Sequence, residues 1–254
     1  MIFKSDLHIH SCLSPCGSLD MSPLDIVKIA RDNGLNLIAI SDHNSALNCP
    51  ALKEVCDQYD DISCLFGIEV TSVEEVHNLT LFDDLEAVLD FGSFLYERLD
   101  TIPNNPEAFG DQVYVNGKNE IIGEVDKYLA GATSLSVEEL LVEVHNRGGL
   151  FIPAHVDRAS YSLTSQLGFI PDNPYDALEF SKFYYRDQAV GSNNQSVINS
   201  EGYPHITNSD SHYPDTLGMV YTEFDIEFPS INCIREALKN GRFNICTPWN
   251  KKFA

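Results

Sequence analysis

Short apolar runs alternate with amphipathic segments along most of the chain. Several of the runs are continuously apolar, which is typical of parallel strands that are buried on both faces. The segments between them have the spacing of surface helices. The pattern predicts strands at residues 2–10, 35–41, 63–70, 76–82, 149–154, 176–181, 205–209 and 243–247.

Capping residues indicate where several helices begin and end. Ser22 precedes Pro23, and Gly34 follows the segment, an order typical of an N-cap, a first-turn proline and a C-terminal stop. Ser136 and Glu139 have the spacing of a capping box. The helices predicted in this way lie at residues 22–34, 136–149 and 230–241.

One segment interrupts this alternation. Asn116 and Gly117 separate two alternating runs within residues 111–125, which is a strong hairpin signal. We therefore expect a single domain over residues 1–254, with a hairpin-containing insertion at residues 83–135. Serial strand–helix units of this number predict either a (β/α) barrel or a doubly wound parallel sheet, and the pattern alone does not separate the two.

Composition and charge narrow the classes of partner. The chain has 254 residues, with 38 acidic and 16 basic side chains and a formal net charge of −22. Such a charge repels nucleic acid and anionic membranes, and no run of Lys or Arg offsets it locally. No stretch approaches the ~18 apolar residues of a membrane span, and the first residues lack a signal-peptide pattern. The seven cysteines show no disulfide framework, so a reducing cytoplasm is the expected location.

The histidines are the most informative polar residues. Six of the eight lie at or near the end of a predicted strand, together with two acids: His8, His10, His43, His77, His155, His212, Glu69 and Asp210. Because the carboxyl ends of parallel strands form one rim, these side chains are expected to converge. His77 is the exception, because it opens its strand. The remaining two, His145 and His205, are interpreted as structural.

Six motifs occur in order between residue 6 and about residue 218: "DLHIHS", "AISDHN", "GIEVT", "VHNLTLF", "PAHVDR" and "NSDSHYP". As a set they resemble the motifs of the PHP family, the polymerase and histidinol phosphatase domains. The resemblance implies an α/β fold, a distorted TIM-like (β/α)7 barrel. It also implies two or three divalent metal ions, with Zn, Mn and Fe as candidates, and hydrolysis of phosphoester bonds by metal-activated hydroxide.

The resemblance further implies a ligand set. The first ion would be held by His8, His10, Glu69 and Asp210, the second by the bridging Glu69 with His77 and His155, and the third by His43 and His212. The third ion usually takes one more ligand from the loop after the first strand, where many family members have the Asp of an "SDG" sequence. This chain has "SPCG" at residues 14–17, so the ligand is either Cys16 or Asp20. We favour Asp20, because oxygen ligands suit Mn²⁺, Fe²⁺ and Zn²⁺ alike.

The expected catalytic residues are Arg158, Glu69 and His212. Arg158 follows His155 by three residues and could grip a phosphate with its planar fork; a surface salt bridge is the competing interpretation. A separate zinc clip that includes Cys12 is not expected, because no further Cys or His has suitable spacing.

Two buried acids are expected to support the ligands. Asp6 shares a strand face with His8 and His10, since residues i and i+2 point to one side. Asp42 precedes His43 directly. Both acids are interpreted as partners that orient imidazole N–H groups.

Three functions are compatible with these residues. The leading hypothesis is hydrolysis of a small phosphomonoester or nucleotide. The alternatives are a 3′→5′ exonuclease-type phosphodiesterase that acts on nucleic acid, and a non-catalytic metal-binding module. The charge of −22 argues against a long nucleic acid, and the complete ligand set argues against a module without turnover.

Overall fold

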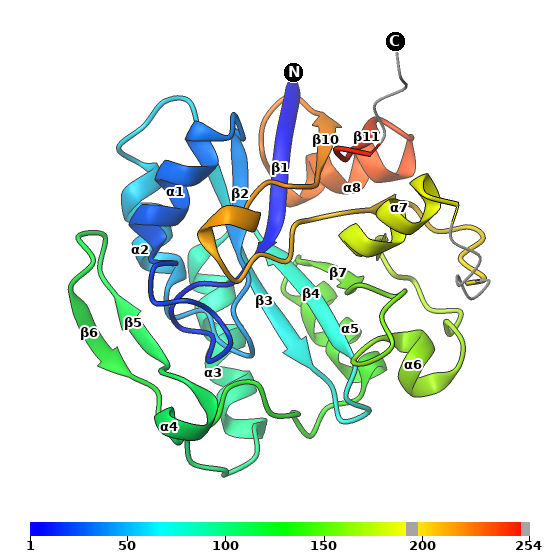
Figure 1. The fold of residues 1–254 in the computed structure, drawn as a ribbon. Helices are drawn as coiled ribbons and strands as arrows, with labels where there is room; N and C mark the ends of the chain where they lie inside the picture. The colour runs from blue at the N-terminus through cyan, green and yellow to red at the C-terminus, as the bar shows by residue number, and fades with distance from the viewer. Residues whose placement is uncertain (192–197, 250–254) are drawn as a thin grey trace.

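The computed structural model describes residues 1–191 and 198–249. Its centre is a seven-stranded sheet with the order β11-β10-β1-β2-β3-β4-β7 (Figure 1). The strands of this sheet are β1 (Ile2–Ile9), β2 (Leu37–Ile40), β3 (Ser63–Thr71), β4 (His77–Phe82), β7 (Leu150–Pro153), β10 (Tyr221–Asp225) and β11 (Phe243–Cys246). Strand β10 is not predicted by the sequence pattern.

Two small sheets and several helices accompany the central sheet. One small sheet pairs β5 (Val113–Val115) with β6 (Ile121–Glu124), and the other pairs β8 (Leu178–Glu179) with β9 (His205–Ile206). The helices are α1 (Pro23–Asp32), α2 (Cys49–Cys56), α3 (Leu85–Arg98), α4 (Pro106–Phe109), α5 (Val137–Asn146), α6 (Leu163–Leu167), α7 (Lys182–Ala189) and α8 (Ile231–Lys239), with a 3₁₀ turn at Pro214–Thr216. All eight predicted strand segments contain a strand.

Strand directions differ from the uniformly parallel expectation. Strands β1, β2 and β3 are parallel, but β4 is antiparallel to β3 and to β7. The β3–β4 pairing places Thr71 opposite His77. The start of β4 therefore lies at the same edge of the sheet as the carboxyl end of β3. This explains why His77 can join the other histidines although it opens its strand.

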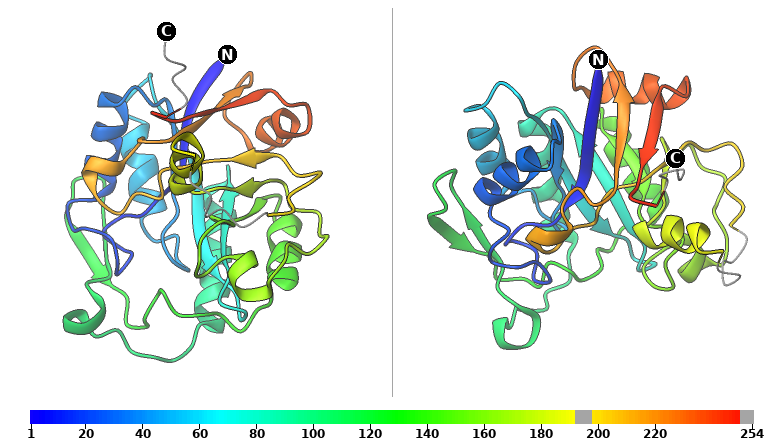
Figure 2. Two further views of the ribbon diagram at one scale, coloured as in Figure 1. Left: turned by 45° about the vertical axis from the view of Figure 1, so that its right-hand side comes forward. Right: turned by 45° about the horizontal axis from the view of Figure 1, so that its top comes forward.

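The sheet is curled like half of a barrel, with helices along its outside (Figures 1 and 2). Backbone hydrogen bonds link β8 and the segment that follows β9 to the strands beside them. The amide of Val156, just past β7, donates to Glu179 O at 2.8 Å, and the amide of His10, just past β1, donates to Ser211 O at 2.9 Å. The structure confirms an α/β fold, whereas a complete (β/α)7 barrel stays a prediction.

The predicted helix starts are confirmed by their hydrogen bonds. The Ser22 side chain accepts from the amide of Asp25, with Pro23 in the first turn of α1. At α5, Ser136 and Glu139 form both halves of the capping box. One buried cluster packs the strands against α8, and two others pack the sheet against α1 and α2 and against α3 and α5.

The predicted hairpin is confirmed, and it lies beside α2 (Figures 1 and 2). The amide of Val115 donates to the side chain of Asn48, the N-cap of α2, at 2.9 Å. Within the turn, Asn119 has the positive φ, at 65°, and the amide of Gly117 donates to the Glu54 carboxylate at 3.0 Å. The expected extent of the domain, 1–254, and of the insertion, 83–135, stay predictions.

Candidate metal centre

Glu69, near the carboxyl end of β3, lies at the centre of the histidines. It is 1% exposed, and five imidazoles surround its carboxylate. The distances to Oε1 are 3.2 Å from His8 Nε2, 3.0 Å from His77 Nδ1 and 3.1 Å from His155 Nε2. Those to Oε2 are 3.3 Å from His10 Nε2 and 3.2 Å from His43 Nδ1. The rim therefore brings six of the expected ligands into one cluster.

Asp210 forms a second carboxylate centre beside Glu69. Its Oδ1 lies 3.2 Å from His10 Nε2 and 3.6 Å from His212 Nδ1, and its Oδ2 lies 2.5 Å from Arg158 Nη2. Asp210 has φ of 48° and His155 has φ of 32°. Side chains with a Cβ rarely adopt this left-handed conformation, and where they do the surrounding structure has to hold them there. Two expected ligands are thus presented by constrained backbone.

Glu179, in β8, supports the cluster and is missed by the sequence analysis. Its carboxylate oxygens lie 3.0 and 3.1 Å from His8 Nδ1, on the ring edge that faces away from Glu69. It also accepts from Asn208 Nδ2 at 2.7 Å and from the amide of His155 at 3.1 Å. The available signal was its position, because Glu179 is an acid near the end of a predicted strand, as Glu69 is.

Asp42 and Asp6 act differently from each other. Asp42 accepts from the Ser14 hydroxyl at 2.7 Å, and Ser14 Oγ lies 3.0 Å from His10 Nδ1, so Asp42 supports an imidazole through Ser14. Asp6 instead accepts backbone N–H groups, from Ser209 at 3.0 Å and from Gly218 at 2.9 Å. The expected contact of Asp6 with an imidazole N–H is wrong. Although Asp6 shares its strand face with the histidines, it stabilises the loop that presents Asp210.

The charges in this cluster oppose one another. Burial alone would raise the pKa of Glu69, but the surrounding imidazoles hold that pKa well below its usual range. Burial lowers the pKa of His10, and the neighbouring carboxylates of Asp210 and Glu69 raise it to about 9. Burial and the neighbouring imidazoles lower the pKa of His43 well below its usual range, and that of His212 to about 4. The rings of His43 and His212 are therefore neutral and have lone pairs available for a cation, whereas a cation bound at His10 would displace the proton from that ring.

Several buried polar atoms at the centre have no hydrogen-bond partner. Among the described residues, these atoms include His8 Nε2, His10 Nε2, His43 Nδ1 and His77 Nδ1. Buried polar groups are almost always paired, so a group of unpaired ring nitrogens facing carboxylates indicates a ligand, most simply a metal ion. The donor atoms fall into three overlapping sets within 4.8 Å: His8, His10 and Glu69; His43, Glu69 and His77; and His10, Cys16, His43 and His212. The residues therefore fit the divalent ions that the sequence predicts.

The two candidates for the loop ligand lie in different places. Both residues are exposed, but Cys16 belongs to one of these sets, whereas Asp20 belongs to none of them among the described residues. Burial, Glu69 and Asp210 raise the pKa of the Cys16 thiol to about 12, so a thiolate there needs a cation beside it. Cys12 Sγ lies 3.8 Å from Val113 O, in a small cluster of apolar side chains against the hairpin.

Arg158 reaches the centre and also borders a cavity. The cavity has a volume of about 720 Å³ and is lined by residues of the β7–α6 loop, α6 and the segment after it. Lys182, at the start of α7, approaches the same region and donates to Ser209 O at 2.9 Å. The two cations make this side of the centre the one that suits an anionic group.

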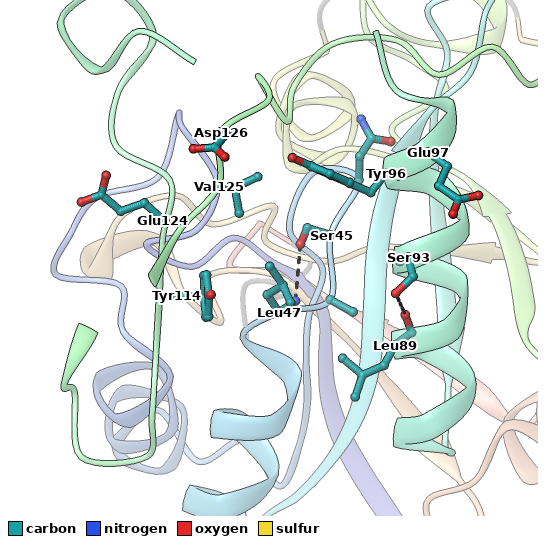
Figure 3. Close-up of a pocket in the computed structure, with 13 residues that line it drawn as sticks. Ser45, Leu47, Leu89, Ser93, Tyr96, Glu97, Tyr114, Glu124, Val125 and Asp126 are labelled. Atoms are coloured by element: carbon teal, nitrogen blue, oxygen red, sulfur yellow. Dashed lines mark hydrogen bonds between the residues drawn. The ribbon is translucent and has the colours of Figure 1, made fainter. Parts of the chain in front are cut away.

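A second cavity has a volume of about 420 Å³, and Asn44, the residue after His43, is one of the residues that line it. Figure 3 shows Tyr96 and Ser93 of α3 facing the loop that carries Leu47, with Tyr114 of β5 on the opposite side. Glu97, Glu124 and Asp126 also line this cavity. Its carboxylates disfavour a phosphate, in contrast to the side that carries Arg158.

The remaining two histidines lie outside the cluster. His145 Nε2 is 2.8 Å from Asp176 Oδ2, and the ring of His205 packs against Phe180 with centroids 4.5 Å apart. Both are absent from the three donor sets found among the described residues. Their interpretation as structural residues agrees with these contacts.

A family model and known proteins resemble this chain. Residues 194–243 match the PHP-associated family model. An uncharacterized protein of Methanocaldococcus jannaschii is 28% identical over 169 residues, which are 66% of this chain and 18% of that protein. The chain therefore spans less than a fifth of this relative's length. No helix within the described ranges is long and apolar enough to cross a membrane.

Solved structures share the fold. The lesion-specific endonuclease Q of Pyrococcus furiosus is 22% identical with a TM-score of 0.65, over 96% of this chain and 58% of that one. A proposed metal-dependent phosphoesterase of Bifidobacterium adolescentis is 17% identical with a TM-score of 0.54, over 83% and 88% of the two chains. The resemblance to the PHP family that the sequence motifs indicate is therefore confirmed, by the PHP-associated segment and by the fold.

Proposed function

We propose that the cluster around Glu69 and Asp210 holds two or three divalent cations and hydrolyses a phosphoester bond. The observation that carries this proposal is the group of buried imidazole nitrogens without partners that face two carboxylates. An apo cluster of this composition leaves donors and acceptors unpaired at a cost of about 1–3 kcal/mol each. Bound cations would pair them. The proposed ligands are His8, His10, His43, Glu69, His77, His155, Asp210 and His212, and Zn, Mn and Fe are the candidate metals.

The protein's own groups have distinct proposed roles. Glu179 and the Asp42–Ser14 pair hold His8 and His10 with their ligating nitrogens toward the carboxylates. Arg158 presents its guanidinium to the anionic oxygens of the substrate, and its contact with Asp210 fixes that position. Divalent cations, when bound, would acidify a water molecule toward neutral pH and neutralise charge on the phosphoryl oxygens.

The proposed substrate is a small phosphorylated molecule, such as a phosphomonoester or a nucleotide. The net charge of −22 disfavours a long polyanion, and the cavity of about 720 Å³ beside Arg158 has the size of a small-molecule site. A nucleic acid is the second candidate, because a lesion-specific endonuclease has a similar fold. A non-catalytic metal-binding module is the third.

We also propose how the barrel closes, how far the domain extends and where in the cell the protein is located. We infer that β8 and β9 close the curled sheet into a distorted barrel through the bonds at Val156 and His10. Residues 1–254 would form one domain, and residues 83–135 would be an insertion that covers one side of the site. The seven cysteines are unpaired, which suits the cytoplasm that we propose as the location.

Metal analysis combined with a substrate panel tests the function. The purified protein is loaded with Zn²⁺, Mn²⁺ or Fe²⁺, and its metal content per chain is measured. It is then assayed on phosphomonoesters, on nucleotides and on short oligonucleotides with and without a lesion. Phosphate release from monomers, lost in His77→Ala, supports the proposal. Cleavage of oligonucleotides alone would replace the small substrate by nucleic acid. Bound metal without any hydrolysis would favour the non-catalytic module.

A further inference from the structure

A cysteine lies with three of the site's histidines at one edge of the metal centre. Cys16 Sγ, a ring nitrogen of His10, one of His43 and one of His212 all lie within 4.8 Å of one another. The His10 ring packs against both others, with centroids 4.7 Å from His43 and 4.1 Å from His212. His10 Nε2 and His43 Nδ1 are fully buried and have no hydrogen-bond partner. The sulfur thus lies close to two imidazole rings that each carry a buried nitrogen without a hydrogen-bond partner.

The loop between β1 and α1 is folded so that it presents Cys16 there. The amides of Ser14 and Gly17 donate to Ser11 O and Ser14 O at 3.1 and 2.9 Å, which gives two successive tight turns. Gly17 has no room for a side chain, because a Cβ would overlap Ser11 O. The amide of Ser18 donates to His212 O at 2.9 Å. This hydrogen bond, two residues after Cys16, holds the loop against the segment that carries His212.

The acidic residue that competes for this role is placed elsewhere. Asp20 lies at the end of the loop with an exposed side chain, and its amide donates to Ser18 Oγ at 3.2 Å. Its carboxylate belongs to none of the donor sets found among the described residues, whereas the Cys16 sulfur belongs to one.

We infer that Cys16 supplies a thiolate ligand to an ion held with His10, His43 and His212, and that this position is selective for zinc. Thiolate and imidazole donors favour Zn²⁺, whereas Mn²⁺ prefers oxygen ligands. The rest of the centre, which has two carboxylates, accepts harder ions. The inference rests on the proposed function only for the premise that the cluster binds metal. It adds that one of the positions differs in chemistry from the others.

Spectroscopy of the cobalt-loaded protein tests this ligand without any assay of activity. Co²⁺ replaces Zn²⁺ in such sites, and a thiolate ligand gives an intense sulfur-to-metal charge-transfer band in the near ultraviolet. The proteins compared are the wild type, Cys16→Ser, Cys16→Asp, Asp20→Asn and the matched control Cys12→Ser. The number of ions per chain is measured for each, and thermal melts show that each variant is folded.

The inference predicts the band in the wild type, Asp20→Asn and Cys12→Ser, and its loss in both Cys16 variants. Cys16→Ser should bind one zinc ion fewer per chain, whereas Cys16→Asp should regain an ion when Mn²⁺ is supplied. Zinc should also protect Cys16 from alkylation, measured by peptide mass spectrometry. A band that survives in Cys16→Ser, or an ion that is lost in Asp20→Asn, would overturn the inference. A normal band in a protein that hydrolyses no phosphoester would leave the thiolate site standing and refute only the proposed function.

Discussion

Two buried carboxylates with histidine neighbours lie at opposite ends of the strands. Asp176, before β8, accepts one hydrogen bond each from His145 Nε2 at 2.8 Å, Arg235 Nε at 2.9 Å and the amide of Phe151 at 2.9 Å. Glu69, near the end of β3, has five imidazoles around two oxygens. The three donors satisfy the Asp176 carboxylate. Five imidazoles surround Glu69, which is more than its two oxygens can accept hydrogen bonds from.

This difference separates a structural ion pair from a binding site. The Asp176 cluster is complete without any further group, so its contribution is to stability. The Glu69 cluster leaves ring nitrogens of His8, His10, His43 and His77 unpaired in the interior. Each unpaired buried nitrogen costs free energy that a bound ion would offset, and this is the physical basis for proposing metal there.

The substitution Glu69→Gln should have the largest effect. An amide of the same shape keeps the packing but removes the charge that bridges the proposed ions. We expect a loss of bound metal and a fall in hydrolysis of more than about 100-fold, beyond the range seen for groups that only support metal ligands. Metal analysis and steady-state kinetics measure both effects. In the matched variant Asp176→Asn, metal content and activity should stay near wild type; equal losses in the two variants would remove the distinction between the clusters.

The substitution Glu179→Gln should have the next largest effect. The Glu179 carboxylate orients the His8 ring and favours proton placement on Nδ1, which leaves Nε2 free as a ligand. We expect metal affinity to fall about 10- to 100-fold, as measured by competition with a chelating dye. Unchanged affinity would show that His8 is held by the protein's packing alone.

The two arginine–aspartate pairs allow a smaller and more selective comparison. Arg158 contacts Asp210 at the centre, and Arg235 contacts Asp176 at the other end of the strands. A lysine keeps the charge but loses the planar fork. Arg158→Lys should raise KM about 10-fold with metal content unchanged, which corresponds to the lower end of a charged hydrogen bond. Arg235→Lys should leave KM unchanged and lower the melting temperature. A normal KM in Arg158→Lys would reduce Arg158 to the surface salt bridge that the sequence also allowed.

The sequence predicts that most of the proposed ligands lie together because these residues follow strand ends. His8 and His10 follow from the two-residue period of a strand, and Glu69 and His155 from the shared rim of neighbouring strands. His77 could not be placed by that rule, since its convergence depends on β4 being antiparallel, which is a property of pairing and not of local pattern.

Supporting residues are harder to predict because they depend on distances across the fold. Glu179 acts on His8, which is 171 positions away, and nothing local marks that partnership. The choice between Cys16 and Asp20 depends on two tight turns, whose path the motif spacing does not reveal. Strand β10 likewise depends on its antiparallel pairing with β1 and β11.

The smallest predicted effect is on how the free energy of unfolding depends on pH when Asp176 is replaced. Burial raises the pKa of Asp176, but hydrogen bonds from His145, Phe151 and Arg235 hold it below the usual value of 3.8. A carboxyl whose pKa is depressed by folding adds stability that is complete above its unfolded pKa and is lost as pH falls through its folded pKa. Asp176→Asn should therefore lower the free energy of unfolding by about 1–3 kcal/mol from about pH 7 down to about pH 5.

Below the unfolded pKa of Asp176 the difference between wild type and variant should shrink. Urea denaturation of both proteins between pH 7 and pH 3, with chelator present, measures it. Because both proteins contain the same histidines around Glu69, titration of those residues cancels in the difference, which leaves Asp176 and the groups paired with it. A difference that vanished already above pH 5 would mean that the Asp176 carboxyl is protonated in the folded protein. The structural cluster would then be as incompletely paired as the metal centre, and the contrast between the two would fail.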